Sequence, residues 1–346
     1  MAINDDLTEV REAHKFDQSA LEDYLLTHVD GFRGPLEIKQ FEGGQSNPTF
    51  MAQTPNQRYV IRKKPPGVLL KSAHQVDREF RVMSALGQTN VPVPKTYCLC
   101  EDESIIGTSF YVMECIEGRV FRDPSLAAET PTERAALWDS MNDTLAKLHS
   151  VDVDAIGLSD FGKPGNYFDR QIGRWTKQYM AAETTNIVEM GRLLEWLPNN
   201  IPADDTVSIA HGDYRLENTI CHPTEPRVIA ILDWELCTLG HPLADLGYNC
   251  MPFHNGDFAN VDFSRYGLPT EKEYLERYCQ RVGRPGIKQW NFYLAFSFFR
   301  LASIVQGVYK RGLDGNASSV KALEYKDTCR ELATIACQIL DRGDII

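Results

Sequence analysis

Alternating apolar and polar positions predict a small β-sheet in the first third of the chain. Three short runs follow this pattern, at residues 36–41, 49–52 and 58–62, and turns containing Gly or Pro separate them. Successive side chains of a strand point to opposite faces, so this alternation is typical of half-buried strands. Residues 97–100 and 109–113 predict two more strands, joined by a turn at residues 101–107. The pattern therefore predicts an antiparallel sheet.

Apolar residues spaced three or four positions apart predict helices before and after these strands. One helix is expected at residues 17–26, with Asp17 or Ser19 as its N-cap, and another at residues 72–86. Beyond residue 118 the pattern becomes mainly helical. Helices are predicted there at residues 131–150, 166–180, 290–309 and 322–340.

Composition limits the class of protein. The chain has 346 residues, of which 43% are hydrophobic, which is typical of a soluble globular protein with two sizeable cores. The most apolar stretch, residues 290–305, includes Asn291 and Arg300, so a buried helix is favoured over a bilayer span. The first 17 residues are acidic and lack the apolar segment of a secretory signal, so we expect a cytoplasmic protein without a membrane partner.

Charge and cysteine usage exclude further classes. The 36 basic and 48 acidic residues give a net charge of −12, which disfavours nucleic acid and anionic membranes as partners. Nine cysteines are scattered without C-x-x-C spacing, which argues against a disulfide framework or a zinc site. Oligomeric state leaves no such mark in the sequence.

The strongest chemical pattern lies between residues 211 and 233. His211-Gly212-Asp213 is followed five positions later by Asn218, and Asp233 follows the apolar run 228–232. Phosphoryl transfer from ATP needs a carboxylate that orients and deprotonates a hydroxyl, and oxygen ligands for Mg²⁺. We therefore expect Asp213 to act as the base and Asn218 and Asp233 to be metal ligands. Either aspartate alone would more simply mark a turn.

These motifs resemble a known family. The catalytic loop has Gly212 where protein kinases have Arg, and Asp233 begins an Asp-Trp-Glu motif in place of Asp-Phe-Gly. In both respects the sequence resembles the aminoglycoside phosphotransferase and choline kinase family of small-molecule kinases. More narrowly, it resembles the kinase-like domain that some eukaryotic proteins carry fused to an acyl-CoA dehydrogenase domain. The resemblance extends from about Phe41 to the 240s.

The resemblance implies a protein-kinase-like, two-lobed α+β fold. An N-terminal helical extension would occupy residues 1–30, and a nucleotide-binding N-lobe with the antiparallel sheet would occupy residues 31–116 and end in a hinge. A mainly helical C-lobe carrying the catalytic and metal loops would occupy residues 117–346. Asp245 would hold the backbone of the catalytic loop.

Candidate nucleotide contacts come from a turn and a strand. In the turn at residues 42–48, paired glycines allow backbone N–H groups to approach phosphate oxygens. The candidates in this turn are Gly43, Gly44, Ser46 and Asn47. Arg62 stands where kinases carry a phosphate-binding Lys, and its guanidinium suits phosphate, with Lys64 as the alternative. The basic run 62–64 could instead form a solvated strand edge.

Two further nucleotide-side assignments depend on kinase geometry. Glu79 occupies the helix position that pairs with the basic strand residue, although Arg78 and Arg81 adjoin it and could pair with it instead. At the predicted hinge, Met113 would border the adenine, and the Glu114 carbonyl and the Ile116 N–H would bond its edge. His149, at a helix end, is expected to be a capping residue outside the site.

The phosphate acceptor is the least determined part. On the helix at residues 166–180, Arg170, Arg174 and Lys177 lie opposite an apolar side. This basic face is either solvated or holds a carboxylate or CoA phosphates. The narrow resemblance implies a hydroxyacyl or hydroxyacyl-CoA acceptor. The alternatives are an aminoglycoside or another small alcohol, or a nucleotide-binding pseudokinase without turnover.

Overall fold

The computed structural model describes residues 7–42, 47–65, 75–256, 258, 261–316 and 320–343. The chain forms two compact units. The first contains residues 1–122, 154–158 and 216–237, and the second contains residues 123–153, 159–215 and 238–346. The predicted domains, with boundaries at residues 30 and 116, are each one continuous segment, whereas the first unit also contains residues 154–158 and 216–237.

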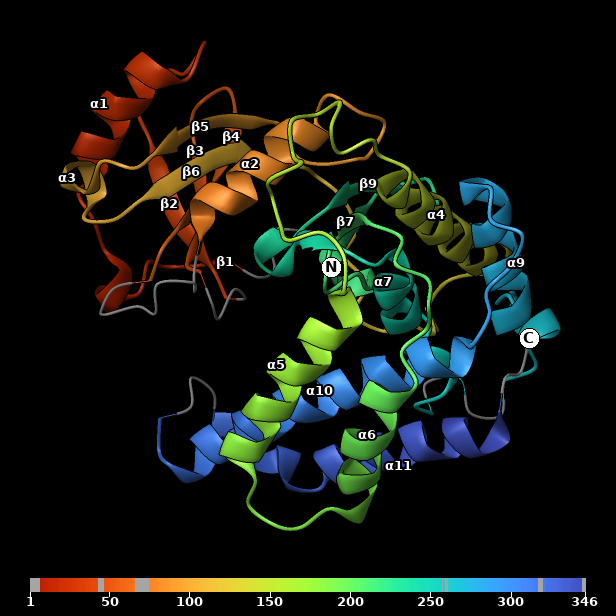
Figure 1. Cartoon of the computed structure of the whole chain (residues 1–346). Coiled ribbons are helices and arrows are strands. Elements are labelled where there is room, and N and C mark those ends of the chain that lie inside the picture. The colour runs from red at the N-terminus through yellow and green to blue at the C-terminus, as the bar shows by residue number, and fades with distance from the viewer. Residues whose placement is uncertain are drawn as a thin grey trace. The chain divides into compact units, whose positions relative to one another are not determined.

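An antiparallel sheet forms the centre of the first unit (Figure 1). Within the described residues its strand order is β1-β2-β3-β4-β6-β5. The strands are β1 (Leu7–Thr8), β2 (Glu37–Phe41), β3 (Thr49–Gln53), β4 (Arg58–Lys63), β5 (Thr96–Cys100) and β6 (Phe110–Glu114). Every neighbouring pair is antiparallel, and in β4 Arg62 lies opposite Thr49 of β3 and Tyr111 of β6. The five predicted strands are therefore confirmed, and β1 is added at the edge.

Alternation along the strands gives the two faces of the sheet different neighbours. Ile61, Phe110 and Val112 belong to an apolar core that also contains residues of helix α1 (Gln18–His28). The intervening positions, among them Tyr111, face helix α2 (Val76–Leu86) instead. Asp17 caps α1 by accepting a hydrogen bond from the backbone of Ala20, as one of the two predicted caps. Two apolar layers therefore hold β4 and β6 at the centre of the sheet.

A short hairpin from later in the chain completes the first unit. Its strands are β8 (Thr219–Cys221) and β9 (Val228–Ile231). The backbone of Cys221 pairs with that of Arg119, and the Ile231 N–H donates to the Pro92 carbonyl at 2.9 Å. Backbone pairing thus explains why residues 216–237 belong to the unit built by the N-terminal sheet.

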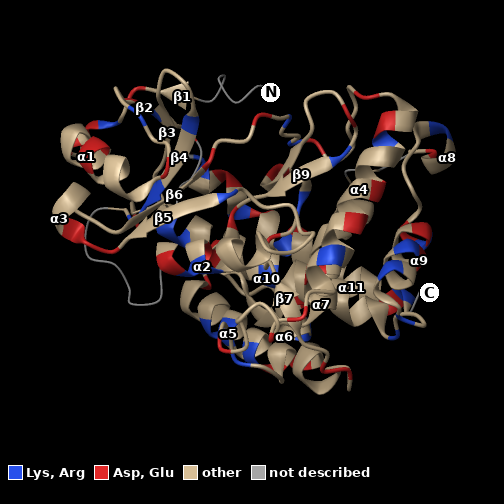
Figure 2. Cartoon of the chain, turned by 90° about the horizontal axis from the view of Figure 1, so that it is seen from above, with Lys and Arg blue, Asp and Glu red and all other residues tan. Residues whose placement is uncertain are grey.

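The second unit is mainly helical. Its long helices are α4 (Pro131–His149), α5 (Tyr167–Ala182), α6 (Val188–Asn199), α9 (Glu271–Val282), α10 (Trp290–Leu313) and α11 (Thr328–Arg342). Shorter elements are α7 (Pro242–Asn249), α8 (Phe263–Tyr266) and the paired strands β7 (Ser208–Ala210) and β10 (Thr238–Gly240). Along α4 and α9, basic and acidic residues are interspersed (Figure 2).

Helix α10 is the core of the second unit and packs against α5, α7 and α11. Phe168 of α5 contacts the rings of Phe292 and Phe296 at centroid distances of 5.1 and 5.0 Å. By length and composition α10 could span a membrane, but 72% of its most apolar window is buried in the protein. The prediction of a buried core helix is therefore confirmed.

Some predicted elements needed correction. The turn at residues 101–107 contains a short helix, α3 (Glu103–Ile106), which Asp102 caps and which ends at Gly107 with a positive φ of 82°. The helix predicted at residues 322–340 is a 3₁₀ segment, Val320–Lys326, followed by α11. Helices α6, α7 and α9 were not predicted. All nine cysteines are free thiols.

Candidate functional site

Arg62 of β4 joins three carboxylates in the first unit. Its Nε lies 2.9 Å from Oε2 of Glu79 on α2, and its Nη2 lies 2.8 Å from Oδ1 of Asp233. The same Nη2 is 3.4 Å from Oε2 of Glu235. Arg62 is buried, so these contacts form in a partly desolvated site. The predicted pairing of Arg62 with Glu79 is confirmed, and the solvated strand edge is excluded.

Glu79 is held by uncharged partners as well. The amide of Asn47 donates to its Oε1 at 2.7 Å, and the hydroxyl of Tyr111 donates to its Oε2 at 3.0 Å. Burial raises the pKa of Glu79, which is 1% exposed, while Arg62 and the two hydrogen bonds favour its charged form. A buried carboxylate is stable only with such partners. Asn47, predicted as a phosphate donor, here supports Glu79.

The other basic residues near Arg62 have different surroundings. Lys63 points to the opposite face of the sheet, where its Nζ lies 5.3 Å from the ring centroid of Phe16, and burial lowers the pKa of this lysine. Arg78 donates to the carbonyl of Cys237, and Arg81 donates to that of Gly157. Of the two candidates, Arg62 of β4 contacts both Glu79 and Asp233, whereas Lys64 follows the end of the strand.

The hairpin brings Asn218 and Asp233 together. Thr219 pairs with Ile231, and the N–H of Leu232 donates to the carbonyl of Asn218 at 2.8 Å, so Asn218, before β8, and Asp233, after β9, lie at the same end of the hairpin. Asp233 adopts φ 62° and ψ 63°, a left-handed conformation that is rare for residues other than Gly. Such backbone conformations cluster at functional sites. Carboxylate and amide oxygens fit the ligand preference of Mg²⁺.

The catalytic loop lies in the second unit between β7 and residue 215. Asp245 of α7 accepts hydrogen bonds from the backbone N–H of His211 at 2.6 Å and from that of Gly212 at 2.8 Å. The loop turns at Gly212, where φ is 86°, a value that favours glycine. The predicted role of Asp245 as the support of this loop is thus confirmed.

Asp213, the predicted base, follows this anchored turn. Its backbone N–H donates to Nδ1 of His211 at 3.2 Å, and Nε of Arg215 lies 3.6 Å from its Oδ1. The side chain of Asp213 retains 21% exposure. The carboxylate of Asp213 is therefore partly accessible, while hydrogen bonds to Asp245 hold the backbone of the two residues before it.

His149 was wrongly predicted to be a helix cap outside the site. Its side chain is 1% exposed, and its Nε2 lies 3.3 Å from Oδ2 of Asp245 while its Nδ1 lies 2.7 Å from the hydroxyl of Tyr278. Burial disfavours the charge of Asp245, but the hydrogen bonds from His149 and from the Gly212 backbone lower its pKa below the ordinary value. His149 therefore supports the loop through Asp245. No local sequence signal marks this role, because the three residues come from separate helices.

Several predicted nucleotide contacts are not tested by the structure. Gly43, Gly44 and Ser46 lie outside the described residues. At the predicted hinge, Met113 is buried and pairs with Val60 and Thr96, whereas Glu114 is exposed. The adenine contacts of Met113, Glu114 and Ile116 therefore stay predictions.

The helix α5 shows the two predicted sides. Phe168, Ile172, Trp175 and Tyr179 are buried. On the opposite side, Arg174 and Lys177 are exposed, whereas Arg170 donates to the carbonyls of Gly165 and Lys163 in the preceding loop. Arg170 thus fixes the loop before the helix. For Arg174 and Lys177 both predicted roles stay open, a solvated basic face or a face that holds a carboxylate or CoA phosphates.

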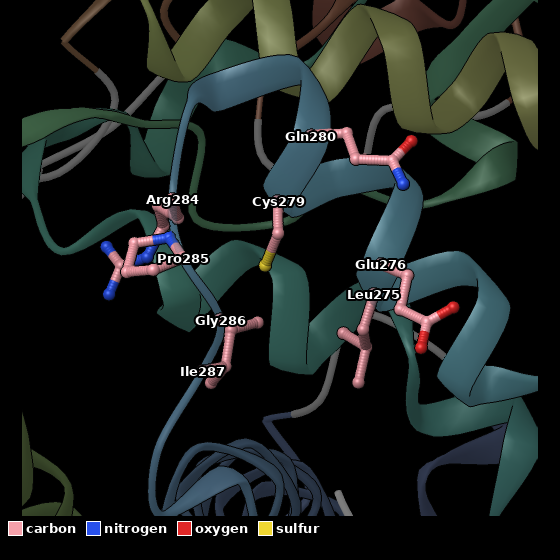
Figure 3. Close-up of a pocket in the computed structure, with 8 residues that line it drawn as sticks. All are labelled: Leu275, Glu276, Cys279, Gln280, Arg284, Pro285, Gly286 and Ile287. Carbon is pink, nitrogen blue, oxygen red and sulfur yellow. The ribbon is translucent and has the colours of Figure 1, made fainter.

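Two surface cavities have linings that differ from the catalytic and metal loops. One of about 200 Å³ lies in the second unit between α9 and residues 284–287, with Cys279 and Arg284 in its lining (Figure 3). The other, of about 300 Å³, lies in the first unit and is lined by Gln53, residues 55–58, Glu114, Cys115 and Glu117. Apart from Glu114, the residues predicted to form the site line neither cavity.

Comparison with known proteins agrees with this geometry. A family model described as "Phosphotransferase enzyme family" matches residues 37–289. Acyl-CoA dehydrogenase family member 10 of Mus musculus is 47% identical over 338 residues, which cover 94% of this chain and 31% of that protein. Acyl-CoA dehydrogenase family member 11 of Homo sapiens is 44% identical over 348 residues, which cover 97% of this chain and 45% of that protein. The chain thus spans less than half the length of these relatives.

Solved structures agree as well. A provisionally named aminoglycoside phosphotransferase of Ralstonia eutropha JMP134 is 51% identical, with a TM-score of 0.88 over 95% of this chain and 100% of that chain. A spectinomycin phosphotransferase is 15% identical, with a TM-score of 0.62 over 94% of this chain and 98% of that chain, and so shares the fold. The predicted kinase-like α+β fold is confirmed. The family match over most of the chain, together with the fold, shows that this protein belongs to the phosphotransferase enzyme family, the small-molecule kinases related to aminoglycoside phosphotransferases.

Proposed function

We propose that this protein transfers the γ-phosphoryl group of ATP to a hydroxyl of a small molecule with the help of Mg²⁺. One observation carries the proposal: Arg62 contacts both Glu79 of α2 and Asp233 of the hairpin. Kinases need a basic strand residue paired with a helix glutamate, next to an acidic metal ligand. A structural protein would have little reason to gather these charges in a buried site.

Each residue then has a defined task. Asp213 orients the acceptor hydroxyl and takes its proton, and the hydroxyl oxygen forms the new P–O bond as the bond to ADP breaks. Asn218 and Asp233 hold Mg²⁺, which neutralises charge on the phosphates. Arg62 contacts the phosphates, together with the turn that contains Gly43, Gly44, Ser46 and Asn47. The hinge residues Met113, Glu114 and Ile116 bind the adenine.

For the acceptor we propose a hydroxyacyl compound, including CoA thioesters. Two observations support this class: the relatives named as acyl-CoA dehydrogenase family members, and the exposed basic side chains of Arg174 and Lys177 on α5. A carboxylate or phosphate that bonds such a side chain gains about 1.5–3 kcal/mol when partly desolvated. A polycationic drug would be repelled instead.

Two other functions have support of their own. The name of the Ralstonia eutropha relative points to an aminoglycoside acceptor. Nucleotide binding without transfer is supported by Arg62, which stands where kinases carry a phosphate-binding Lys. A cytoplasmic location is proposed with each of these functions.

The test is ATP consumption with and without Mg²⁺ across a panel of hydroxyacyl-CoA compounds, small alcohols and kanamycin-like aminoglycosides. Asp213→Asn should abolish turnover and keep the thermal shift by ATP, whereas Asp314→Asn, an exposed aspartate on another surface, should change neither. Full turnover in folded Asp213→Asn would refute the assignment of the base. An ATP shift independent of metal, without product from any acceptor, would favour the nucleotide-binding protein.

Charge reversal on α5 tests the acceptor class. Arg174→Glu with Lys177→Glu should raise the KM of a hydroxyacyl-CoA substrate and leave the KM of ATP unchanged. The same reversals at Lys310 and Arg311, at the end of α10, are the matched control. Efficient phosphorylation of aminoglycosides, with hydroxyacyl-CoA compounds inert, would contradict the proposed acceptor.

A further inference from the structure

Arg300 of α10 is a buried cation that the proposed mechanism does not use. Its side chain is 5% exposed, and its Nη2 donates a hydrogen bond to the carbonyl of Gly212, the residue before the proposed base. Among the residues that the structure describes, it makes no ion pair with a carboxylate. An arginine is costly to bury, so a buried one without an ion pair needs another reason to be there.

Two aromatic rings take the place of a carboxylate partner. The guanidinium carbon of Arg300 lies 5.5 Å from the ring centroid of Tyr248 on α7 and 5.7 Å from that of Trp175 on α5. Both distances are within the range of cation–π attraction. These rings fix the guanidinium from two neighbouring helices, so that its donor stays aimed at the loop.

Tyr248 lies close to the proposed base: burial raises the pKa of its hydroxyl, and the charge of Asp213 adds to this effect. Arg300 holds the Gly212 carbonyl, and the ring of Tyr248 contacts the guanidinium that does so. On the other side, Asp245 holds the amides of His211 and Gly212.

The peptide between Gly212 and Asp213 depends on these contacts. Gly212 has a positive φ of 86° and no side chain, so its own conformational preference does little to fix this peptide. Loss of the bond to its carbonyl would leave a buried acceptor without a partner and free the peptide to rotate. A displacement of the base by about 1 Å can cost about 100-fold in rate.

We propose that Arg300 and Tyr248 are positioning residues that fix the orientation of Asp213 for proton abstraction. Arg300 acts on the backbone before the base, and Tyr248 acts through Arg300, whose guanidinium lies 5.5 Å from its ring centroid. This role rests on the proposed function of Asp213. It also connects α5, which carries Trp175 and the basic side chains of the proposed acceptor site, to the catalytic loop.

Kinetics of ADP release from MgATP test the positioning role. In Arg300→Met, kcat should fall about 10- to 100-fold while the KM of MgATP stays within about twofold. Arg300→Lys, which keeps the charge and a donor, should recover part of the loss. Arg311→Met, an exposed arginine on the same helix, is the control. A rise in KM without a fall in kcat would overturn the role of Arg300.

Tyr248→Leu tests the ring contact and does not depend on Arg300 variants folding. Leucine offers no ring to the guanidinium of Arg300, so kcat should fall while the KM of MgATP stays within about twofold. Tyr248→Phe keeps the ring and is the matched control, which should keep kcat within about twofold of wild type. An equal fall in kcat in both variants would overturn the role of the ring.

A measurement without turnover separates this inference from the proposed function. Amide hydrogen exchange at Gly212 and Asp213 is compared in wild type and Arg300→Met. Faster exchange of these two amides, with unchanged exchange of the α4 amides, supports the contact even in a protein that proves inactive. Equal exchange overturns the inference even in a protein that turns over MgATP.

Discussion

Replacement of Asp245 by asparagine tests how the catalytic loop is held. The carboxylate is 1% exposed and accepts from the backbone of His211 at 2.6 Å, from the backbone of Gly212 at 2.8 Å and from Nε2 of His149 at 3.3 Å. Each of its oxygens faces a loop amide. Asparagine has one oxygen, so its NH₂ group would face the other N–H and leave one buried donor without a partner.

The magnitude follows from these contacts. A buried donor without a partner costs about 1–3 kcal/mol, and the remaining hydrogen bond loses the strength that a charged acceptor adds. We expect Asp245→Asn to lower the free energy of unfolding by about 2–4 kcal/mol at pH 7. His149→Gln leaves both loop amides bonded to Asp245, so it should cost less.

The pH dependence gives a second signature. The pKa of Asp245 is lowered in the folded protein, so this group stabilises the fold at pH values above its unfolded pKa of about 3.9. That stability is lost as the pH falls through the folded pKa. The difference between wild type and Asp245→Asn should therefore shrink below about pH 4.

Urea unfolding between pH 3 and 7, analysed by linear extrapolation, measures these differences. Asp314→Asn on the surface is the control, because its ion pair with Lys310 is solvent-exposed and such pairs contribute little. A loss below about 0.5 kcal/mol at pH 7 would refute the reasoning. A loss that is the same at pH 3 and pH 7 would show that the charge of Asp245 is not its source.

Three further changes test other parts of the structure. Arg62→Ala should lower the free energy of unfolding by about 3–5 kcal/mol and slow MgATP turnover, because Glu79 is left buried without its cation. Adding Glu79→Gln should restore part of the stability, and no restoration in urea unfolding would argue against the buried pair. In His241→Asn, which keeps an N-cap acceptor for α7, the loss of stability between pH 6.5 and pH 4 should be smaller than in wild type by up to about 3 kcal/mol. Burial and the charge of Arg284 lower the pKa of His241 to about 4. Between pH 6.5 and pH 4 this histidine is therefore protonated in the unfolded chain but not in the folded wild type, which lowers the free energy of unfolding. Equal pH profiles of the two proteins would contradict this. Gly212→Ala should cost about 1–2 kcal/mol and lower kcat, since φ there is 86°; unchanged thermal stability would show that the loop tolerates a side chain.

Local patterns in the sequence determined five strands of the N-terminal sheet, several helices and the chemical motifs. Alternation along residues 58–62 placed Arg62 and Lys63 on opposite faces of a strand, and the structure confirms both environments. The sequence itself fixes the number of residues between Asp213, Asn218 and Asp233, so the phosphotransferase motif can be recognised before the fold is known. Periodicity and spacing act over a few residues, which is why they are accessible from a single sequence.

Only the tertiary structure decided which side chains support the site. Arg62 meets Asp233 across 171 positions, His149 meets Asp245 across 96, and Arg300 meets Gly212 across 88. None of these pairs has a local pattern, and His149 was assigned to a helix cap on local grounds alone. The packing of whole helices and strands brings such residues together, because burial of their apolar faces sets which polar groups must then find partners in the interior.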